Sequence, residues 1–357
     1  QKLKSLVLES YHKDYNAKLV DYAGFKMPIQ YTAIKSEHYH VRNHVGVFDV
    51  SHMGEIVVSG PESELFLENC TTNDISKLSI GNVQYSCFTN INGGTIDDLL
   101  VYKIDLNEFM LVVNASNIAK DFKWLNSINN FDCQIINESD DTSLLAIQGP
   151  ESQKLLFDLG LENIYKLKYY NFYKTSIGKL NNVLVSRTGY TGEIGFEIYV
   201  KNKDIEYLWN KIFSVKSNLK PIGLAARDTL RLEMGYCLYG NELSETISPI
   251  EANLSWIVSK NKKFIGSKKA FEKNKRILIG LELLERGIAR HGYEVYDDKK
   301  DLIGVVTSGT MSPSLEKSIA LAIVNIQKLD KTKNLFVSIR KKFIKAKKVN
   351  YPFYEKK

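Results

Sequence analysis

The first three-quarters of the chain alternates between segments with the two-residue period of strands and segments with the period of helices. Strands are expected at 54–59, 83–89, 98–104 and 109–114, and helices at 36–43 and 116–128. Between two of these strands, Asn92-Gly93-Gly94 indicates a hairpin turn, because glycine adopts positive φ at no steric cost. This mixture of elements predicts an α+β architecture.

A tetrapeptide marks a second copy of the same pattern. Gly60–Ser63 and Gly149–Ser152 both read Gly-Pro-Glu-Ser, and each lies after a strand and before an amphipathic helix. Further strands are expected at 144–148, 172–176, 184–187 and 196–200, followed by a helix with Asp204 as its N-cap. The repeated order predicts an internal duplication of an α+β module.

The pattern changes at about Arg276. Short strands separated by Gly-, Ser- and Asp-rich turns are expected at 277–284, 293–296, 302–307, 319–326 and 335–339. Helical periodicity is nearly absent, so we expect a separate all-β barrel or roll after a junction near 268–275.

Composition narrows the class of protein. A hydrophobic content of 44% with 25% charged residues is typical of a well-cored globular chain, and no apolar run approaches the ~20 residues that span a bilayer. Residues 1–10 lack the apolar core of a secretory signal, although a targeting peptide could have been removed before them. The net charge of +7 is spread along the chain, with excesses at 260–275 and 341–348. Solvated lysines explain these excesses better than an acidic partner does, and no nucleic-acid motif accompanies them.

The cysteines and histidines carry no recognisable metal or nucleophile motif. Four isolated cysteines lack ligand spacing, so reduced, inert thiols are expected. His40 and His44 would share a helix face, but no third ligand accompanies them and a metal site is not expected.

Four segments contain more glycine and charge than their strands require. They are 51–55, 92–98, 186–197 and 223–228. The third has glycines in a GxxGxxG pattern, but it runs into an alternating strand and not into a helix N-terminus, so a dinucleotide site is excluded.

Asp97 and Asp98 form the most conspicuous acidic pair. In a strand they point to opposite sides and cannot share a proton, so one should face a pocket while the other stabilises the turn. From the pattern alone, two carboxylates that only satisfy turn amides remain an equally good interpretation.

These segments resemble the T-protein of the glycine cleavage system over essentially the whole chain. The matching blocks are 20–28, 45–55, 93–99, 187–197, 226–233, 307–309 and 352–354. The resemblance implies a duplicated, ferredoxin-like folate-binding α+β region at 1–275, in two intertwined subdomains of which one covers about 52–140. It also implies a C-terminal β-barrel domain at 276–357.

The resemblance also implies a reaction. An aminomethyltransferase takes the aminomethyl group from the lipoyl arm of H-protein and transfers its carbon to tetrahydrofolate. Ammonia and 5,10-methylenetetrahydrofolate are released. Tetrahydrofolate is then a co-substrate, lipoylated H-protein is the partner, and no metal, nucleic acid or membrane is involved. The expected location is a bacterial cytoplasm, or the mitochondrial matrix in a eukaryote.

By the same resemblance, Asp98 is the catalytic carboxylate, a hydrogen-bond acceptor at the folate nitrogen. Glu197 accepts the N–H groups of the pterin edge, and Arg227 contacts the ligand, although an ion pair with Asp228 or Glu233 fits Arg227 nearly as well. The remaining folate-lining residues are Met53, Tyr85, Leu100, Asn114 and Tyr190. Structural roles are favoured for His52, as a hydrogen-bonding residue, and for Trp256, as a core residue.

Two related activities remain as alternatives on the same fold. A non-transferase folate-binding protein would carry a KGCYxGQE run, which this chain lacks. A folate-dependent demethylase is the other. The intact 186–193 and 226–233 blocks favour the aminomethyltransferase.

Overall fold

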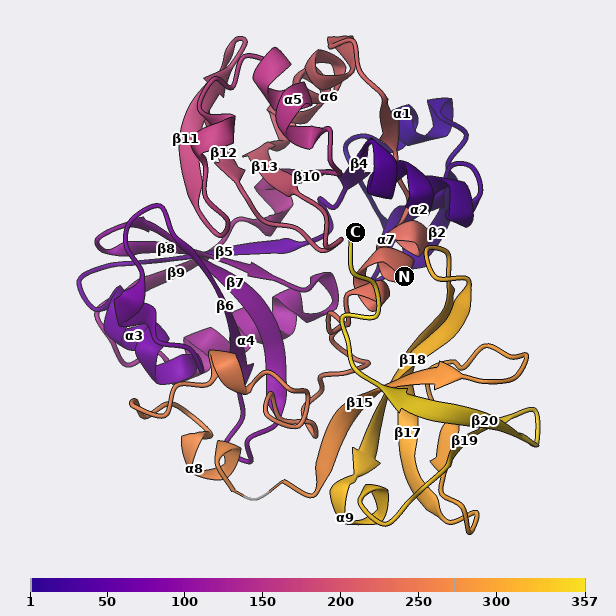
Figure 1. Ribbon diagram of the computed structural model, residues 1–357. Coiled ribbons are helices and arrows are strands. Elements are labelled where there is room, and N and C mark those ends of the chain that lie inside the picture. The colour runs from indigo at the N-terminus through magenta and orange to yellow at the C-terminus, as the bar shows by residue number, and fades with distance from the viewer. Residues whose placement is uncertain (1, 273, 357) are drawn as a thin grey trace. The chain divides into compact units, whose positions relative to one another are not determined.

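The computed structural model describes residues 2–272 and 274–356 (Figure 1). The chain forms two compact units: the first comprises Gln1–Leu67, Ile75–Tyr85 and Leu99–Asp228, and the second comprises Glu68–Asp74, Ser86–Asp98 and Thr229–Lys357. Within the described ranges, no helix is long and apolar enough to cross a membrane.

Two consecutive stretches of chain repeat one order of elements. The first runs through β5 (Gly54–Ser59), α3 (Ser63–Cys70), β6 (Val83–Thr89), β7 (Thr95–Asp105), β8 (Glu108–Val113), α4 (Ile118–Ile128) and β9 (Gln134–Asn137). The second runs through β10 (Thr142–Gln148), α5 (Ser152–Asp158), β11 (Phe172–Ile177), β12 (Leu180–Ser186), β13 (Gly195–Lys201), α6 (Ile205–Ser214) and β14 (Leu219–Pro221). The duplication predicted from the repeated tetrapeptide is confirmed by this topology.

The two sheets place corresponding strands in the same order. One sheet is β6-β7-β8-β5-β9, and the other is β11-β12-β13-β10-β4-β14, in which β4 (Val45–Asp49) is inserted beside β10. Only glycine fits at the first position of the second tetrapeptide. A Cβ on Gly149 would lie 2.2 Å from the carbonyl oxygen of His44, and the φ of Gly149 is +130°. The repeated Gly-Pro-Glu-Ser therefore marks a tight strand-to-helix turn.

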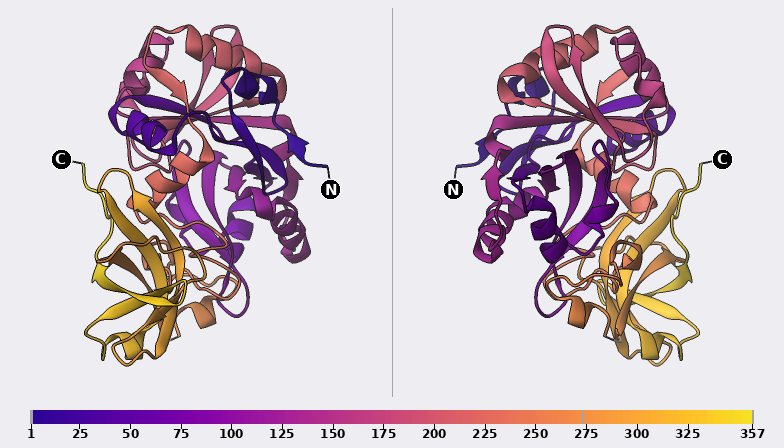
Figure 2. Two further views of the ribbon diagram at one scale, coloured as in Figure 1. Left: turned by 90° about the vertical axis from the view of Figure 1, so that its right-hand side faces the viewer. Right: turned by 90° about the vertical axis from the view of Figure 1, so that its left-hand side faces the viewer.

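The six-stranded sheet carries a continuous apolar core. Helices α5 and α6 lie beside the strands of this sheet (Figures 1 and 2). Their Leu156, Leu208 and Trp209 belong to one buried cluster with Ile198 of β13 and Val185 of β12. The N-terminal segment adds a small sheet of order β1-β3-β2 and two helices. These elements are β1 (Lys4–Ser5), α1 (Glu9–Asp14), β2 (Lys18–Tyr22), β3 (Phe25–Gln30) and α2 (Ile34–Asn43).

The predicted C-terminal barrel is confirmed. Its closed order is β15-β18-β17-β16-β19-β20, with every pair antiparallel. The strands are β15 (Arg276–Leu283), β16 (Glu294–Tyr296), β17 (Leu302–Ser312), β18 (Lys317–Asn325), β19 (Leu335–Ile339) and β20 (Lys342–Val349). Strand β20 was not expected, because outward-facing lysines mask the inward, buried Ile344 and Ala346.

Three local expectations are wrong. The Asp204 side chain makes no capping hydrogen bond, since a 3₁₀ turn at Asn202–Asp204 leads directly into α6. Trp256 is 69% exposed and is not a core residue. Asp98 does not begin its strand, because β7 already starts at Thr95, whose N–H donates to the carbonyl of Ser244. The domain boundaries 1–275, 52–140 and 276–357 stay predictions.

Candidate functional site

Glu197 is the buried carboxylate around which the first unit concentrates its polar side chains. It lies on β13 directly opposite Ser186 of β12 and is only 7% exposed. Its Oε1 accepts a short hydrogen bond from the Thr188 hydroxyl. Within the described part of the chain, Oε2 receives no hydrogen bond, so one oxygen is held by the protein and the other is available to a ligand.

Burial and charge act in opposite directions on this carboxyl. Burial raises the pKa of Glu197, while the Thr188 hydrogen bond and the positive charge of Arg227 lower it; burial has the larger effect. Thr188 and Arg227 therefore favour the ionised form of Glu197, whereas burial favours its neutral form.

Arg227, on α7 (Leu224–Glu233), is held by aromatic rings. Its guanidinium carbon lies 4.7 Å from the ring centroid of Tyr190 and 6.0 Å from that of Phe48. Its Nη1 is buried and has no hydrogen-bond partner. Among the described residues it forms no ion pair, so the alternative of a salt bridge with Asp228 or Glu233 is wrong; Glu233 instead accepts hydrogen bonds from Ser312 and Ser314.

Two of the three glycines in segment 186–197 make room for one glutamine. A Cβ on Gly189 or Gly195 would lie 2.2 or 2.3 Å from the side chain of Gln148. Gln148 donates to the carbonyl of Thr188 at 3.1 Å and accepts from the Thr191 hydroxyl at 2.9 Å. The GxxGxxG pattern thus anchors a loop onto β10, which agrees with the exclusion of a phosphate cradle.

His52 is a neutral, buried imidazole next to these groups. Burial and, after it, the charge of Arg227 lower its pKa to about 3. Its ring lies edge-on to Tyr22 and Phe25, with centroids 5.6 and 6.3 Å away, and Nδ1 has no hydrogen-bond partner. A histidine that is already deprotonated at neutral pH and enclosed by rings acts by packing and polarity; the hydrogen-bonding role expected for it stays a prediction.

Asp97 and Asp98 point to opposite faces of β7, as predicted. Asp97 is fully buried, whereas Asp98 is partly exposed. In the second unit, burial raises the pKa of the Cys87 and Cys237 thiols. The negative charge of Asp98 raises it further for both, after that of Glu242 in the case of Cys237, so both thiols stay protonated at neutral pH.

The other expected lining residues lie at strand ends and loops of the first unit. Met53 follows β4 in a turn closed by its N–H to the carbonyl of Val50, and Asn114 directly follows β8. Tyr85 and Leu100 lie on β6 and β7, and Tyr190 lies in the loop before β13. All five are partly exposed and can contact a ligand. The first unit thus contains every expected folate-lining residue, with the catalytic candidate Asp98 in the second unit.

Four residues of the Glu197 environment were not anticipated. Tyr102, Tyr199, Ser186 and Thr188 are buried and connect to Glu197 through hydroxyl groups. The Ser and Thr are part of the recognised polar segment, but strand alternation gives no sign that two tyrosines of different sheets meet.

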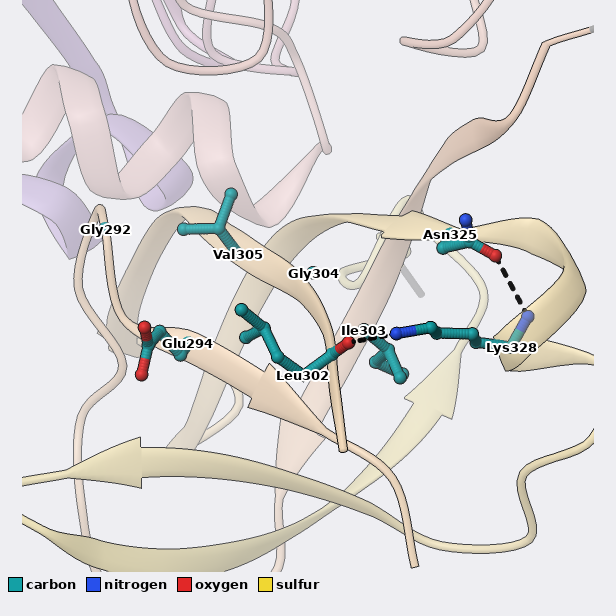
Figure 3. Close-up of a pocket in the computed structure, with 8 residues that line it drawn as sticks. All are labelled: Gly292, Glu294, Leu302, Ile303, Gly304, Val305, Asn325 and Lys328. Carbon is teal, nitrogen blue, oxygen red and sulfur yellow. Dashed lines mark hydrogen bonds between the residues drawn. The ribbon is translucent and has the colours of Figure 1, made fainter. Parts of the chain in front are cut away.

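A groove in the second unit is lined by barrel residues and contains none of the expected site residues (Figure 3). Lys328 Nζ in this groove donates to the carbonyl of Leu302 at 2.8 Å. Over the described ranges, no three His, Cys, Asp or Glu side chains are grouped to hold a metal ion.

Two family models match this chain. The model of the GCVT N-terminal domain matches residues 8–262, and the model of the glycine cleavage T-protein C-terminal barrel domain matches residues 276–355. The chain belongs to the glycine cleavage T-protein family.

Relatives of this T-protein family member match over their full length. A Flavobacterium psychrophilum protein named aminomethyltransferase is 47% identical over 99% of this chain and all of its own. One from Bacillus subtilis with the same name is 43% identical, also over 99% and 100%. The crystal structure of glycine cleavage system aminomethyltransferase T from Bartonella henselae has a TM-score of 0.91 at 35% identity, covering 99% of this chain and 98% of that one.

Proposed function

We propose that this T-protein family member is the aminomethyltransferase of a glycine cleavage system. It transfers the carbon of an aminomethyl group from the dihydrolipoyl arm of H-protein to tetrahydrofolate. The single observation that carries the proposal from the site is the buried Glu197 carboxylate, with one oxygen held by Thr188 and the other open, near the unpaired Nη1 of Arg227.

The reaction exchanges two bonds at one carbon. The carbon loses its bonds to the amine nitrogen and to the lipoyl sulfur, and it gains bonds to two folate nitrogens. The two protons displaced from those nitrogens leave on ammonia and on the dihydrolipoyl thiol. No electrons are transferred to an acceptor, so the protein has to supply orientation and electrostatic stabilisation.

In the proposed site, Glu197 accepts the paired N–H donors of the pterin edge through Oε2. A carboxylate suits this task because it only accepts hydrogen bonds and its charge strengthens them. Met53, Tyr85, Leu100, Asn114 and Tyr190 line the folate, and Arg227 donates from Nη1 to an oxygen of the ligand. A buried donor without a partner gains more from such a bond than a solvated one.

Asp98 is the proposed catalytic carboxylate. As ammonia departs, positive charge develops on the carbon and its neighbouring nitrogen, and a nearby carboxylate lowers the energy of that state. Asp98 accepts a hydrogen bond from the folate nitrogen and stabilises this cation. The matched Gly93–Leu99 block supports the assignment.

Tetrahydrofolate is the co-substrate and lipoylated H-protein is the partner in this proposal. The proposed location is a bacterial cytoplasm, which the bacterial relatives support.

The decisive experiment measures 5,10-methylenetetrahydrofolate and ammonia formed from aminomethylated H-protein, with and without tetrahydrofolate. We expect stoichiometric production of both that depends on folate. Ammonia release that is equally fast without tetrahydrofolate, or demethylation of a methylated amine at comparable kcat/KM, would contradict the proposal and favour a different activity on this fold.

A further inference from the structure

We propose that Tyr102 is a positioning residue, which holds the Glu197 carboxylate ionised and correctly oriented through a chain of buried hydroxyl groups. The inference rests on the proposed folate-binding role of Glu197 and assigns a function to residues that do not touch the ligand.

The chain of hydroxyl groups runs without a break from β7, in one sheet, to β12 and β13, in the other. The Tyr102 hydroxyl on β7 lies 3.0 Å from that of Tyr199 on β13 and 3.0 Å from that of Ser186 on β12. The Ser186 hydroxyl lies 2.8 Å from that of Thr188, which donates to Glu197 Oε1. The tyrosine rings meet edge to face, with centroids 5.5 Å apart.

Counting protons gives the hydroxyl chain one favoured direction when Glu197 is ionised. A carboxylate only accepts, so Thr188 donates its one proton to Glu197 and can only accept from its other neighbours, Ser186 at 2.8 Å and Tyr102 at 3.5 Å. The alternative acceptor for the Ser186 proton, the backbone carbonyl of Glu197, is 3.4 Å away, so the shorter contact favours donation to Thr188. In that arrangement Ser186 accepts from Tyr102, and Tyr102 accepts from Tyr199. Burial raises the pKa of both phenols, so each keeps its proton and remains a donor.

A chain of hydroxyls that all point the same way is polarised by the charge at its end. Each bond strengthens the next, and low local polarity increases the effect. Protonation of Glu197 removes the charge that polarises the chain and weakens the hydrogen bond that Thr188 donates to it. The chain therefore favours the ionised carboxylate over the neutral acid.

The charged and titratable groups around Glu197 are few. Arg227 of α7 favours ionisation, and the phenols of Tyr102 on β7 and Tyr199 on β13 contribute the hydroxyl chain. The charge of Glu55 on β5 adds to the burial that raises the pKa of Tyr199. The residues of β10 that lie opposite β13 around Glu197 are uncharged; they are Leu145, Ala146 and Ile147. The protonation of Glu197 thus depends on burial, which favours the neutral acid, and on Arg227 and the hydroxyl chain, which favour the ionised form.

The test is Tyr102→Phe, which deletes one hydroxyl and keeps the ring. Tetrahydrofolate binding is measured calorimetrically and KM and kcat are measured with aminomethylated H-protein, from pH 5.5 to 8.5. We expect the acid midpoint of folate binding to move upward, KM at pH 6 to rise about threefold to tenfold, and kcat at saturating folate to change less than about twofold. Tyr199→Phe, which removes only the far end of the chain, should cause a smaller shift in the same direction.

The matched control is Tyr173→Phe. Tyr173 lies on β11 of the same unit, and its hydroxyl is buried without a hydrogen-bond partner. It should leave the pH profile unchanged. An unaltered acid midpoint in Tyr102→Phe, or an equal change in the Tyr173→Phe control, would overturn the positioning role. If Tyr102→Phe does not fold, Tyr199→Phe decides by the same criterion.

Glu197→Gln separates this inference from the proposed function. If Glu197→Gln binds tetrahydrofolate as well as the unaltered protein, the pterin role of Glu197 is wrong, and the positioning inference fails with it. If Glu197→Gln loses binding while Tyr102→Phe and Tyr199→Phe keep the original pH profile, only the positioning role is wrong.

Discussion

The Arg227 guanidinium lies over the Tyr190 ring, 4.7 Å from its centroid, and its Nη1 is buried without a partner. Aromatic faces stabilise a cation without using its N–H donors, so the arginine is oriented and its donors stay available. The contact joins α7 to the loop before β13, two segments that are distant in sequence.

This contact predicts a difference between two substitutions of Arg227. Arg227→Lys keeps the charge but loses the planar group that stacks on Tyr190, and tetrahydrofolate should bind about tenfold more weakly. Tyr190→Phe keeps the ring face and should change affinity less than about threefold, whereas Tyr190→Ala should approach the Arg227→Lys effect. Calorimetric titration with tetrahydrofolate measures all three, and equal affinities for Arg227→Lys and the unaltered protein would contradict the role.

Substitution of Asp98 should lower turnover, whereas substitution of Asp97 should lower stability. Asp98→Asn removes the proposed negative charge at the reaction centre, and kcat should fall about 100-fold or more while folate affinity changes less than about threefold. Asp97 is fully buried, so Asp97→Asn should chiefly lower the thermal midpoint. Asp105→Asn, at the exposed end of the same strand, is the control for both. Near-normal turnover of Asp98→Asn would refute its catalytic assignment.

Glu55 should make stability depend on pH. Its two oxygens are buried without partners, and burial raises its pKa well above the ordinary value of 4.5. Above pH 4.5 the unfolded chain releases this proton while the folded protein retains it, so the free energy of unfolding falls as pH rises, by up to about 1.4 kcal/mol per pH unit, until the folded pKa is reached.

Glu55→Gln should remove this decline, because the amide does not titrate. Urea unfolding at pH 5, 6 and 7 should show the variant gaining stability relative to the unaltered protein as pH rises. Glu206→Gln, on the exposed face of α6, is the control and should follow the unaltered protein. Parallel curves for Glu55→Gln and the unaltered protein would exclude a protonated Glu55.

The turn before Asp97 should tolerate no side chain at Gly94. An added Cβ would lie 1.8 Å from the carbonyl oxygen of Glu245, a backbone atom that cannot rotate away. Gly94→Ala should therefore cost more than about 2 kcal/mol of folding free energy, measured by urea unfolding. At Gly287 an added Cβ meets side-chain atoms only, the nearest a methyl at 3.1 Å, so Gly287→Ala should cost far less. Similar losses in both variants would contradict the steric argument.

Much of this architecture could be predicted from the sequence because the signals are local. The period of apolar residues identified β5, β6 and β10, and the repeated Gly-Pro-Glu-Ser revealed the duplication. Strand β20 escaped because its lysines obscure the alternation, and Trp256 was misplaced because burial depends on which segments cover a side chain.

The candidate site, too, could be predicted only in part from the sequence. The chain alone identified the polar segments, the opposed faces of Asp97 and Asp98 and, through resemblance, Glu197 and Arg227 as candidates. Only the tertiary structure decided that Arg227 stacks on Tyr190 instead of pairing with an acid, and that Tyr102 and Tyr199 connect to Glu197 through hydroxyls. Periodicity and turn chemistry act between near neighbours and are written in the sequence, whereas hydrogen bonds across sheets depend on which strands pack together, and that is set by the whole core at once.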